Sequence, residues 1–245
     1  MILKENYELQ HIEELKLKTG NDPVLIERCL FAFGLLEALR KVELPFIFKG
    51  GTCLMLLLKE PKRLSTDIDI IVDPNTTGIA YNSNKDMEII KQMFDVSCLI
   101  DEFDDQNTTL EIYKNCVSEE SKFRGKSFTY QECLIDTIKT CLCICSRGRY
   151  DSSHYQPLLY GIRCVKSHIF GAKYTGEIAA QDACKILYFA SCLVTNSQFQ
   201  IINEPVKDEI HLQKPFNLLS PIRKIYPIAF SYVVESSKLL KGFTF

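Results

Sequence analysis

Apolar positions recur at helical spacing over several stretches of the chain. In residues 23–42 the apolar positions on one helical face are Ile26, Leu30, Phe33, Leu36 and Leu39. Asp22 and Pro23 are typical of a capping residue followed by the first helical position. We therefore predict a helix from Pro23 to about Val42, after a polar segment of residues 1–20 that forms a short helix or arm.

The second half of the chain shows the same helical periodicity. Thr129, with Glu132 three residues later, is the signature of a capping box, so a helix is predicted over residues 129–146. Further helices are expected over residues 157–170 and 177–194. Prolines interrupt the remainder of the chain, which predicts short helices separated by turns.

Runs that favour β-strands are shorter. Residues 46–48 and 67–72 predict two strands, with a glycine turn, a helix and a loop between them. Residues 96–103 and 108–117 are two further strand candidates, because the segment 104–107, Asp-Asp-Gln-Asn, is a good hairpin connection.

Composition narrows the class of protein. The 245 residues are 46% hydrophobic and 24% charged, which is ordinary for a globular protein. Because the net charge is −2, the protein has no overall positive surface charge, and contact with nucleic acid is expected only in a local patch. No apolar run is long enough for a membrane span, and the N-terminus has no signal-peptide pattern. The 11 cysteines contain no C-x-x-C pair, so we expect reduced, buried thiols and a cytoplasmic protein.

The segment around the first two predicted strands carries the most specific chemistry. Gly50 and Gly51 let phosphates approach the backbone, and Thr52 opens a helix whose N–H groups favour an anion. Asp67 and Asp69 stand two residues apart on a strand, so their carboxylates share one face. Two such carboxylates are costly to hold together without a cation, and Mg²⁺ takes oxygen ligands while leaving room for phosphates. Asp67 and Asp69 are therefore the predicted metal ligands and catalytic residues of a nucleotidyl-transfer site.

A longer motif resembles a known family. Lys-Gly-Gly-Thr-x-Leu followed by Arg-x-Ser-x-Asp-x-Asp is similar to the AbiEii/AbiGii toxin family of the DNA polymerase β-type nucleotidyltransferase superfamily. The matching residues are Lys49, Gly50, Gly51, Thr52, Leu54, Arg63, Ser65, Asp67 and Asp69. The resemblance implies an α+β fold. Its polymerase β-type nucleotidyltransferase core, a mixed sheet with flanking helices, spans residues 1–125, and a helical domain, residues 126–245, completes the nucleotide site.

The resemblance also suggests roles for the residues of the motif. The segment Lys49–Thr52 lies at the phosphate cradle. Arg63 either clamps the triphosphate or pairs with an acidic neighbour, and Ser65 either holds its loop through hydrogen bonds to the backbone or is modified.

By the same resemblance, a third carboxylate on a neighbouring strand takes the proton from the attacking hydroxyl. Glu111 and Asp101 are the candidates, and Glu111 is preferred. A lysine from the helical half offsets phosphate charge as the leaving group departs, and Lys185 is preferred over Lys139. The alternative role of Lys185 is an ion pair with Asp182, three residues before it. The candidates for a later aspartate are Asp208, with Lys185, and Asp151, with Lys139.

The predicted function is that of a Mg²⁺-dependent nucleotidyltransferase, with Mn²⁺ as the alternative metal. It transfers a nucleoside monophosphate from a nucleoside triphosphate to a hydroxyl of RNA, such as a tRNA end, or of a protein. By resemblance it is the toxin of a toxin–antitoxin or abortive-infection system, with a separately encoded antitoxin as partner and no membrane association. The alternatives are a non-catalytic nucleotide sensor and an enzyme that modifies a small, aminoglycoside-like hydroxyl compound.

Overall fold

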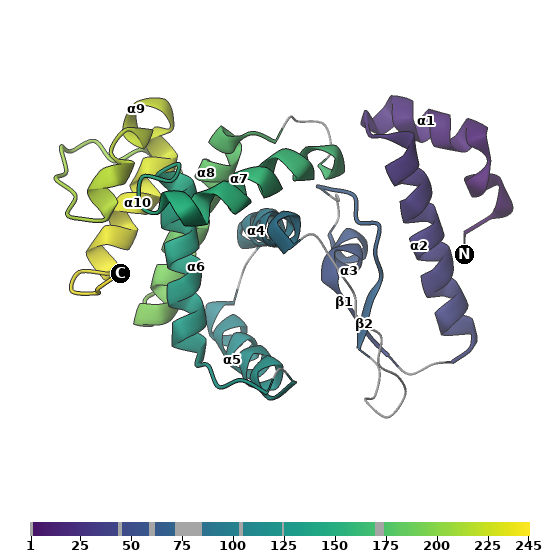
Figure 1. Cartoon of the computed structure of the whole chain (residues 1–245), viewed down its shortest axis with the longest axis horizontal. Helices are drawn as coiled ribbons and strands as arrows, with labels where there is room; N and C mark the ends of the chain where they lie inside the picture. The colour runs from purple at the N-terminus through teal and green to yellow at the C-terminus, as the bar shows by residue number, and fades with distance from the viewer. Residues whose placement is uncertain are drawn as a thin grey trace. The chain divides into compact units, whose positions relative to one another are not determined.

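A computed structural model describes residues 2–43, 46–58, 62–71, 85–102, 105–123, 125–169 and 174–245. These residues form helices and a two-stranded antiparallel sheet (Figure 1). They divide into two compact units, the first of Met1–Asp95 and Gly161–Tyr174, the second of Val96–Tyr160 and Thr175–Phe245. These two units do not follow the predicted domain boundary near residue 125, because the chain from Val96 onward is grouped with the later helices.

The first unit begins with two packed helices. Its N-terminal elements are η1 (Lys4–Tyr7), α1 (Leu9–Thr19) and α2 (Pro23–Lys41). The Asp22 side chain accepts a hydrogen bond from the Val24 N–H at 2.8 Å, and Pro23 occupies the first helical position, so the predicted start of α2 is confirmed. Ile12, Ile26 and Cys29 of these helices form a buried apolar cluster with Leu64.

The sheet of the first unit joins the two predicted strands. β1 (Ile47–Lys49) and β2 (Asp69–Ile71) run antiparallel, with Lys49 opposite Asp69. Helix α3 (Gly50–Leu57) begins directly after β1. The predicted order of strand, glycine turn, helix, loop and strand is therefore confirmed, but β2 begins at Asp69, so Asp67 lies before the strand that was predicted to carry it.

The strand predicted over residues 96–103 is wrong. Most of this segment lies in helix α4 (Lys85–Asp101). Ser97 and Ile100 are 3% and 2% exposed, whereas the residue before each of them is 37% and 39% exposed. Burial at a spacing of three is helical, and a strand would alternate. The apolar run is the end of an amphipathic helix.

The strand predicted over residues 108–117 is also wrong, because it lies inside helix α5 (Gln106–Phe123). Asp105 Oδ1 accepts hydrogen bonds from the N–H groups of Asn107 and Thr108, each at 3.1 Å. Asp105, predicted to lie in a hairpin connection, is thus the N-terminal cap of a helix. The described residues combine helices with a small sheet, an α+β arrangement, and the mixed sheet of a polymerase β-type core stays a prediction.

Helix α8 (Gly176–Thr195) is the centre of the second unit, where it packs against α6 (Tyr130–Cys145) and α10 (Pro227–Leu239) (Figure 1). Thr129 and Glu132 form the predicted capping box of α6, so this helix is confirmed. The helix predicted over residues 177–194 is confirmed as α8. The other elements of the later chain are α7 (Ser152–Val165), η2 (Lys166–His168), η3 (Phe216–Leu219) and α9 (Ile222–Ile225), which includes the predicted short helices near the C-terminus.

The start predicted for α7, at Pro157, is wrong. The Asp151 side chain accepts hydrogen bonds from the N–H of His154, at 3.0 Å, and from the hydroxyl of Ser153, at 2.7 Å. This cap starts the helix at Ser152, and Pro157 lies inside it.

Of the helices that the structure describes, α8 alone is long and apolar enough to cross a membrane by length and composition. Its most apolar window has a mean hydropathy of 1.2, and 67% of that window is buried. Because α6 and α10 cover it, its place in the core of the second unit accounts for its apolar character.

Candidate functional site

The glycine turn of the first unit lies directly against one of the predicted metal ligands. Gly50 has φ +80°, a conformation that favours glycine, and it begins α3 after Lys49. A Cβ atom at Gly50 would lie 2.0 Å from Asp69 Oδ2. The first N–H groups of a helix have no acceptor within the helix, so the turn presents donors beside the Asp69 carboxylate.

The second glycine faces the Arg-x-Ser part of the motif. A Cβ atom at Gly51 would lie 2.2 Å from Arg63 Nη2 and 2.9 Å from Ser65 Oγ. Residues far apart in the motif therefore meet at the glycine pair, and a side chain at either glycine would fill the space between them.

Asp67 and Ser65 are held through their backbones. The hydroxyl of Thr52, which is fully buried, donates a hydrogen bond to the Asp67 carbonyl. The Cys29 thiol donates to the Ser65 carbonyl at 3.1 Å, and burial raises the pKa of this thiol to about 11. Ser65 itself is 6% exposed. These contacts fix the approach to β2, which agrees with a loop-holding role for this segment.

Charges converge on Asp69. Burial raises the pKa of this carboxyl, the negative charges of Asp67 and Glu88 raise the pKa further, and the positive charges of Lys49 and Lys91 oppose the rise. A cation between neighbouring carboxylates relieves such repulsion, and hard oxygen ligands suit Mg²⁺. Asp67 and Asp69 therefore fit part of a magnesium shell.

Among the described residues, no three His, Cys, Asp or Glu side chains cluster as the ligands of one metal ion would. Magnesium is commonly held by one or two carboxylates together with substrate phosphates and water. The pair of aspartates is consistent with that mode of binding.

Arg63 pairs with an acidic neighbour. Its Nε and Nη2 donate to the two carboxylate oxygens of Asp95 at 2.7 and 2.6 Å, and its Nη1 donates to the Leu64 carbonyl at 3.0 Å. The side chains of Arg63 and Asp95 are 7% and 13% exposed. Of the two roles considered for Arg63, the ion pair is the one that the structure contains.

Three residues near the aspartate pair were not found from the sequence: Glu88 and Lys91, whose charges act on Asp69, and His168, which interacts with Asp67. Lys91 is 3% exposed, and its Nζ lies 2.9 Å from Glu88 Oε1. Burial, together with the positive charges of Lys91 and Arg63, lowers the pKa of His168 to about 4. The sequence gives no signal for these residues, because Glu88 and Lys91 read as ordinary polar positions of a helix.

The third-carboxylate candidates lie on helices of the second unit, and both were expected on strands. Asp101 is in the last turn of α4, where both of its carboxylate oxygens are 2.8 Å from Lys185 Nζ. Glu111 is exposed on α5. Lys185 pairs with Asp101 and not with Asp182, the alternative partner, whose carboxylate accepts a hydrogen bond from Ser97 Oγ at 2.8 Å.

The second set of candidates from the helical half is dispersed. Lys139 is half-buried on α6, and Asp151 caps α7 as described above. Asp208 is exposed, and its carbonyl accepts a hydrogen bond from Arg223 at 2.9 Å. The roles of Lys185, Lys139 and Glu111 in a nucleotide site stay predictions.

The motif geometry agrees with comparison of the sequence against protein families. Residues 34–140 match the family described as nucleotidyl transferase AbiEii toxin, type IV TA system. The predicted resemblance to AbiEii is confirmed. This family consists of nucleotidyltransferase toxins of type IV toxin–antitoxin systems, and the matched segment contains the glycine pair and both aspartates. No curated protein and no solved structure matches the chain.

Proposed function

We propose that the chain is a metal-dependent nucleotidyltransferase that transfers a nucleoside monophosphate from a nucleoside triphosphate to a hydroxyl acceptor. The observation that carries this proposal is the seating of Asp69 against Gly50 at the first turn of α3. A carboxylate beside the N–H groups of a helix start suits a triphosphate that binds together with a magnesium ion.

In this reaction the acceptor oxygen forms a bond to the α-phosphorus, and the bond from that phosphorus to the oxygen of the leaving group breaks. Pyrophosphate leaves, and the hydroxyl proton passes to a carboxylate, for which Glu111 is the preferred candidate. The N–H groups of Gly50–Thr52 hold the terminal phosphates. Lys185, or Lys139 in its place, offsets the charge that develops on pyrophosphate.

Asp67 and Asp69 would hold Mg²⁺ or Mn²⁺, which when bound polarises the α-phosphate and neutralises triphosphate charge. The Arg63–Asp95 pair and the Thr52 hydrogen bond keep this segment in place without a ligand. The acceptor in the proposal is RNA, such as a tRNA end, or a protein. The setting is the cytoplasm, with an antitoxin as the partner that a type IV system requires.

A non-catalytic nucleotide sensor is the second candidate. Within the described ranges no third carboxylate joins Asp67 and Asp69 in a metal-binding cluster, and the Asp101 carboxylate is engaged with Lys185. A site with the phosphate cradle but without a base would bind a triphosphate and release no pyrophosphate.

Label transfer distinguishes these candidates. Purified protein is incubated with Mg²⁺, total cellular RNA and each of the four α-labelled nucleoside triphosphates in turn. Asp67→Asn is compared with Asp136→Asn, an exposed aspartate on α6 that serves as the matched control. We expect labelled RNA or labelled protein with one triphosphate, a loss of at least about 100-fold in Asp67→Asn, and no loss in the control.

Triphosphate binding without label in any macromolecule, and without pyrophosphate release, would contradict the proposal and support the sensor. Pyrophosphate release that depends on an added small hydroxyl compound would instead indicate a small-molecule acceptor.

A further inference from the structure

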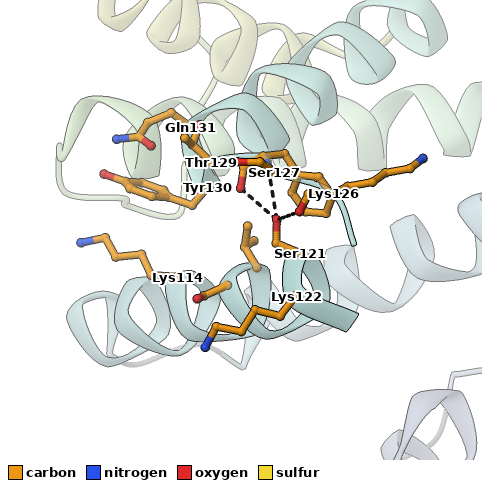
Figure 2. A pocket seen from close by; sticks show the side chains of 11 residues that line it. Lys114, Ser121, Lys122, Lys126, Ser127, Thr129, Tyr130 and Gln131 are labelled. Atoms are coloured by element: carbon orange, nitrogen blue, oxygen red, sulfur yellow. Dashed lines mark hydrogen bonds between the residues drawn. The ribbon is translucent and has the colours of Figure 1, made fainter. Parts of the chain in front are cut away.

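A cationic cavity lies between α5 and α6 in the second unit, apart from every residue assigned above (Figure 2). Its volume is about 460 Å³. Three lysines and four hydroxyl residues line it, together with apolar and aromatic side chains, and none of the lining residues is acidic. The lining residues are Lys114, Val117, Ser118, Ser121, Lys122, Lys126, Ser127, Phe128, Thr129, Tyr130 and Gln131.

Local hydrogen bonds build this cavity. Helix α5 ends at Phe123, and Gly125, with a φ of +59°, lies in the turn that follows it. The Ser121 hydroxyl then donates to the Lys126 carbonyl at 2.9 Å and accepts from the Phe128 N–H at 3.1 Å (Figure 2). The capping box begins α6 at the next residue, Thr129. The described part of the loop, residues 125–128, is thus tied to α5 through Ser121 and leads directly into α6.

Two acidic residues near the cavity, Glu132 and Glu119, are engaged in local contacts. Glu132 accepts from the Thr129 N–H at 2.7 Å and from its hydroxyl at 2.9 Å. Glu119 pairs with Lys122 at 2.7 Å, with side chains 73% and 69% exposed. An ion pair this exposed is weak, so an anion in the cavity can take over Lys122. Among the described residues, Lys126 forms no ion pair.

An aromatic ring positions the third lysine. Lys114 Nζ lies 5.1 Å from the centre of the Tyr130 ring, within the range of a cation–π contact. Lys114 and Tyr130 come from α5 and α6, so the contact bridges the two sides of the cavity (Figure 2). The pair places positive charge next to an aromatic surface.

The shape of the cavity decides the kind of ligand. None of the eleven lining residues is buried, so the cavity is an open shelf and does not enclose a small molecule. Several lysines with hydroxyl donors along an open surface suit a chain of phosphates, and an aromatic side chain suits stacking by an unpaired base. Because the chain has a net charge of −2, this local patch stands out against the rest of the sequence.

We propose that the shelf between α5 and α6, defined by Lys114, Lys122, Lys126 and Tyr130, binds the sugar-phosphate backbone of single-stranded RNA. The lysines contact consecutive phosphates, and Tyr130 stacks with a base while it holds Lys114. This deepens the proposed function, because it assigns RNA as the molecule that carries the acceptor hydroxyl. Binding at the shelf needs neither a triphosphate nor a metal.

The test measures binding of a fluorescein-labelled, twelve-nucleotide oligouridylate by anisotropy, in EDTA and without nucleotide. Lys114→Glu/Lys122→Glu/Lys126→Glu is compared with Lys207→Glu/Lys224→Glu/Lys241→Glu, which changes the charge equally at exposed lysines elsewhere in the second unit. Loss of three phosphate contacts is expected to weaken binding at least about tenfold and to reduce the salt slope by about 2. The control triple variant is expected to stay within about twofold of the unmodified chain, because it leaves those contacts in place.

Variants of Tyr130 distinguish binding of RNA from binding of any polyanion. Tyr130→Ala is expected to weaken RNA binding at least about fivefold, and Tyr130→Phe to leave it unchanged. Equal losses in the two triple variants would overturn the proposal. Binding of a heparin fragment or of anionic vesicles as tightly as RNA, with no effect of Tyr130→Ala, would also overturn it. Because the assay contains no triphosphate, failure of nucleotidyl transfer would leave this result unaffected.

Discussion

Lys185 Nζ lies 2.8 Å from both carboxylate oxygens of Asp101. The sequence offered these two residues separately, one as the lysine that acts on the leaving group and the other as a candidate third carboxylate. Their ion pair joins α8 to the end of α4 within the second unit. Asp101 is 58% exposed, whereas Lys185 is 15% exposed, so Lys185 is the more confined partner.

This pair leads to the first prediction. If Lys185 offsets charge on pyrophosphate, Lys185→Met lowers the transfer rate at least about 100-fold, because the transition state loses a positive charge. Asp101→Asn is expected to stay within about threefold of the unmodified chain, because the lysine remains. Single-turnover transfer rates at saturating triphosphate measure both effects. No loss in Lys185→Met would contradict the prediction and move it to Lys139, whereas equal losses in the two variants would favour Asp101 as the third carboxylate.

The second prediction concerns Gly50. Gly50→Ala and Gly20→Ala both place a side chain at positive φ, +80° and +72°, which costs about 1 kcal/mol of stability in each case. Only at Gly50 does the new Cβ meet Asp69, whereas at Gly20 nothing lies within 4 Å. We expect similar losses in the free energy of unfolding, measured with urea, and loss of transfer in Gly50→Ala alone. Transfer that survives in Gly50→Ala would mean that Asp69 can move without consequence.

The third prediction tests the role of Arg63. Removal of its buried partner in Asp95→Ala leaves a cation without its carboxylate, so the free energy of unfolding is expected to fall by about 3 kcal/mol. Glu119→Ala breaks the exposed pair with Lys122 and is the control, for which no measurable change is expected. Urea titrations measure both variants. A change in triphosphate affinity in Asp95→Ala without a loss of stability would favour the clamp role for Arg63.

The fourth prediction is a pH dependence. Burial lowers the pKa of His168 to about 4, below the value of about 6.5 for an unfolded histidine. As the pH falls below 6.5 the unfolded chain takes up the proton first, so this contribution to stability is present above pH 6.5 and lost toward pH 4. The loss is expected to reach about 3 kcal/mol.

His168→Gln removes this contribution and is compared with His211→Gln, an exposed histidine. Urea unfolding at intervals between pH 4.5 and pH 7.5 measures the slope. A slope in His168→Gln as steep as that of the control would contradict the prediction.

Local signals in the sequence determined the elements that rest on short-range chemistry. The cap at Asp22 with Pro23, and the capping box at Thr129, fix helix starts through hydrogen bonds over two or three residues. The glycine pair and the two aspartates were found in the same way, because their order along the chain already specifies a turn and a strand. The family match confirms the identity of this segment.

The errors arose where the same residues suit two structures. An apolar run such as residues 96–103 fits a strand or the end of a helix, and only the burial of Ser97 and Ile100, three positions apart, decides between them. Asp105 likewise suits a hairpin or a helix cap. Its carboxylate accepts hydrogen bonds from N–H groups in the first turn of α5, so it is a helix cap.

The sequence by itself therefore determined the glycine turn and the position of the second strand in the Lys49–Asp69 segment, because glycine conformation and β propensity act over a few residues. Tertiary structure alone decided the partners of the long charged side chains. Arg63 pairs with Asp95, 32 positions later in the chain, and Lys185 pairs with Asp101, 84 positions earlier. Which of several carboxylates such a side chain reaches depends on how helices pack, and no local pattern encodes that choice.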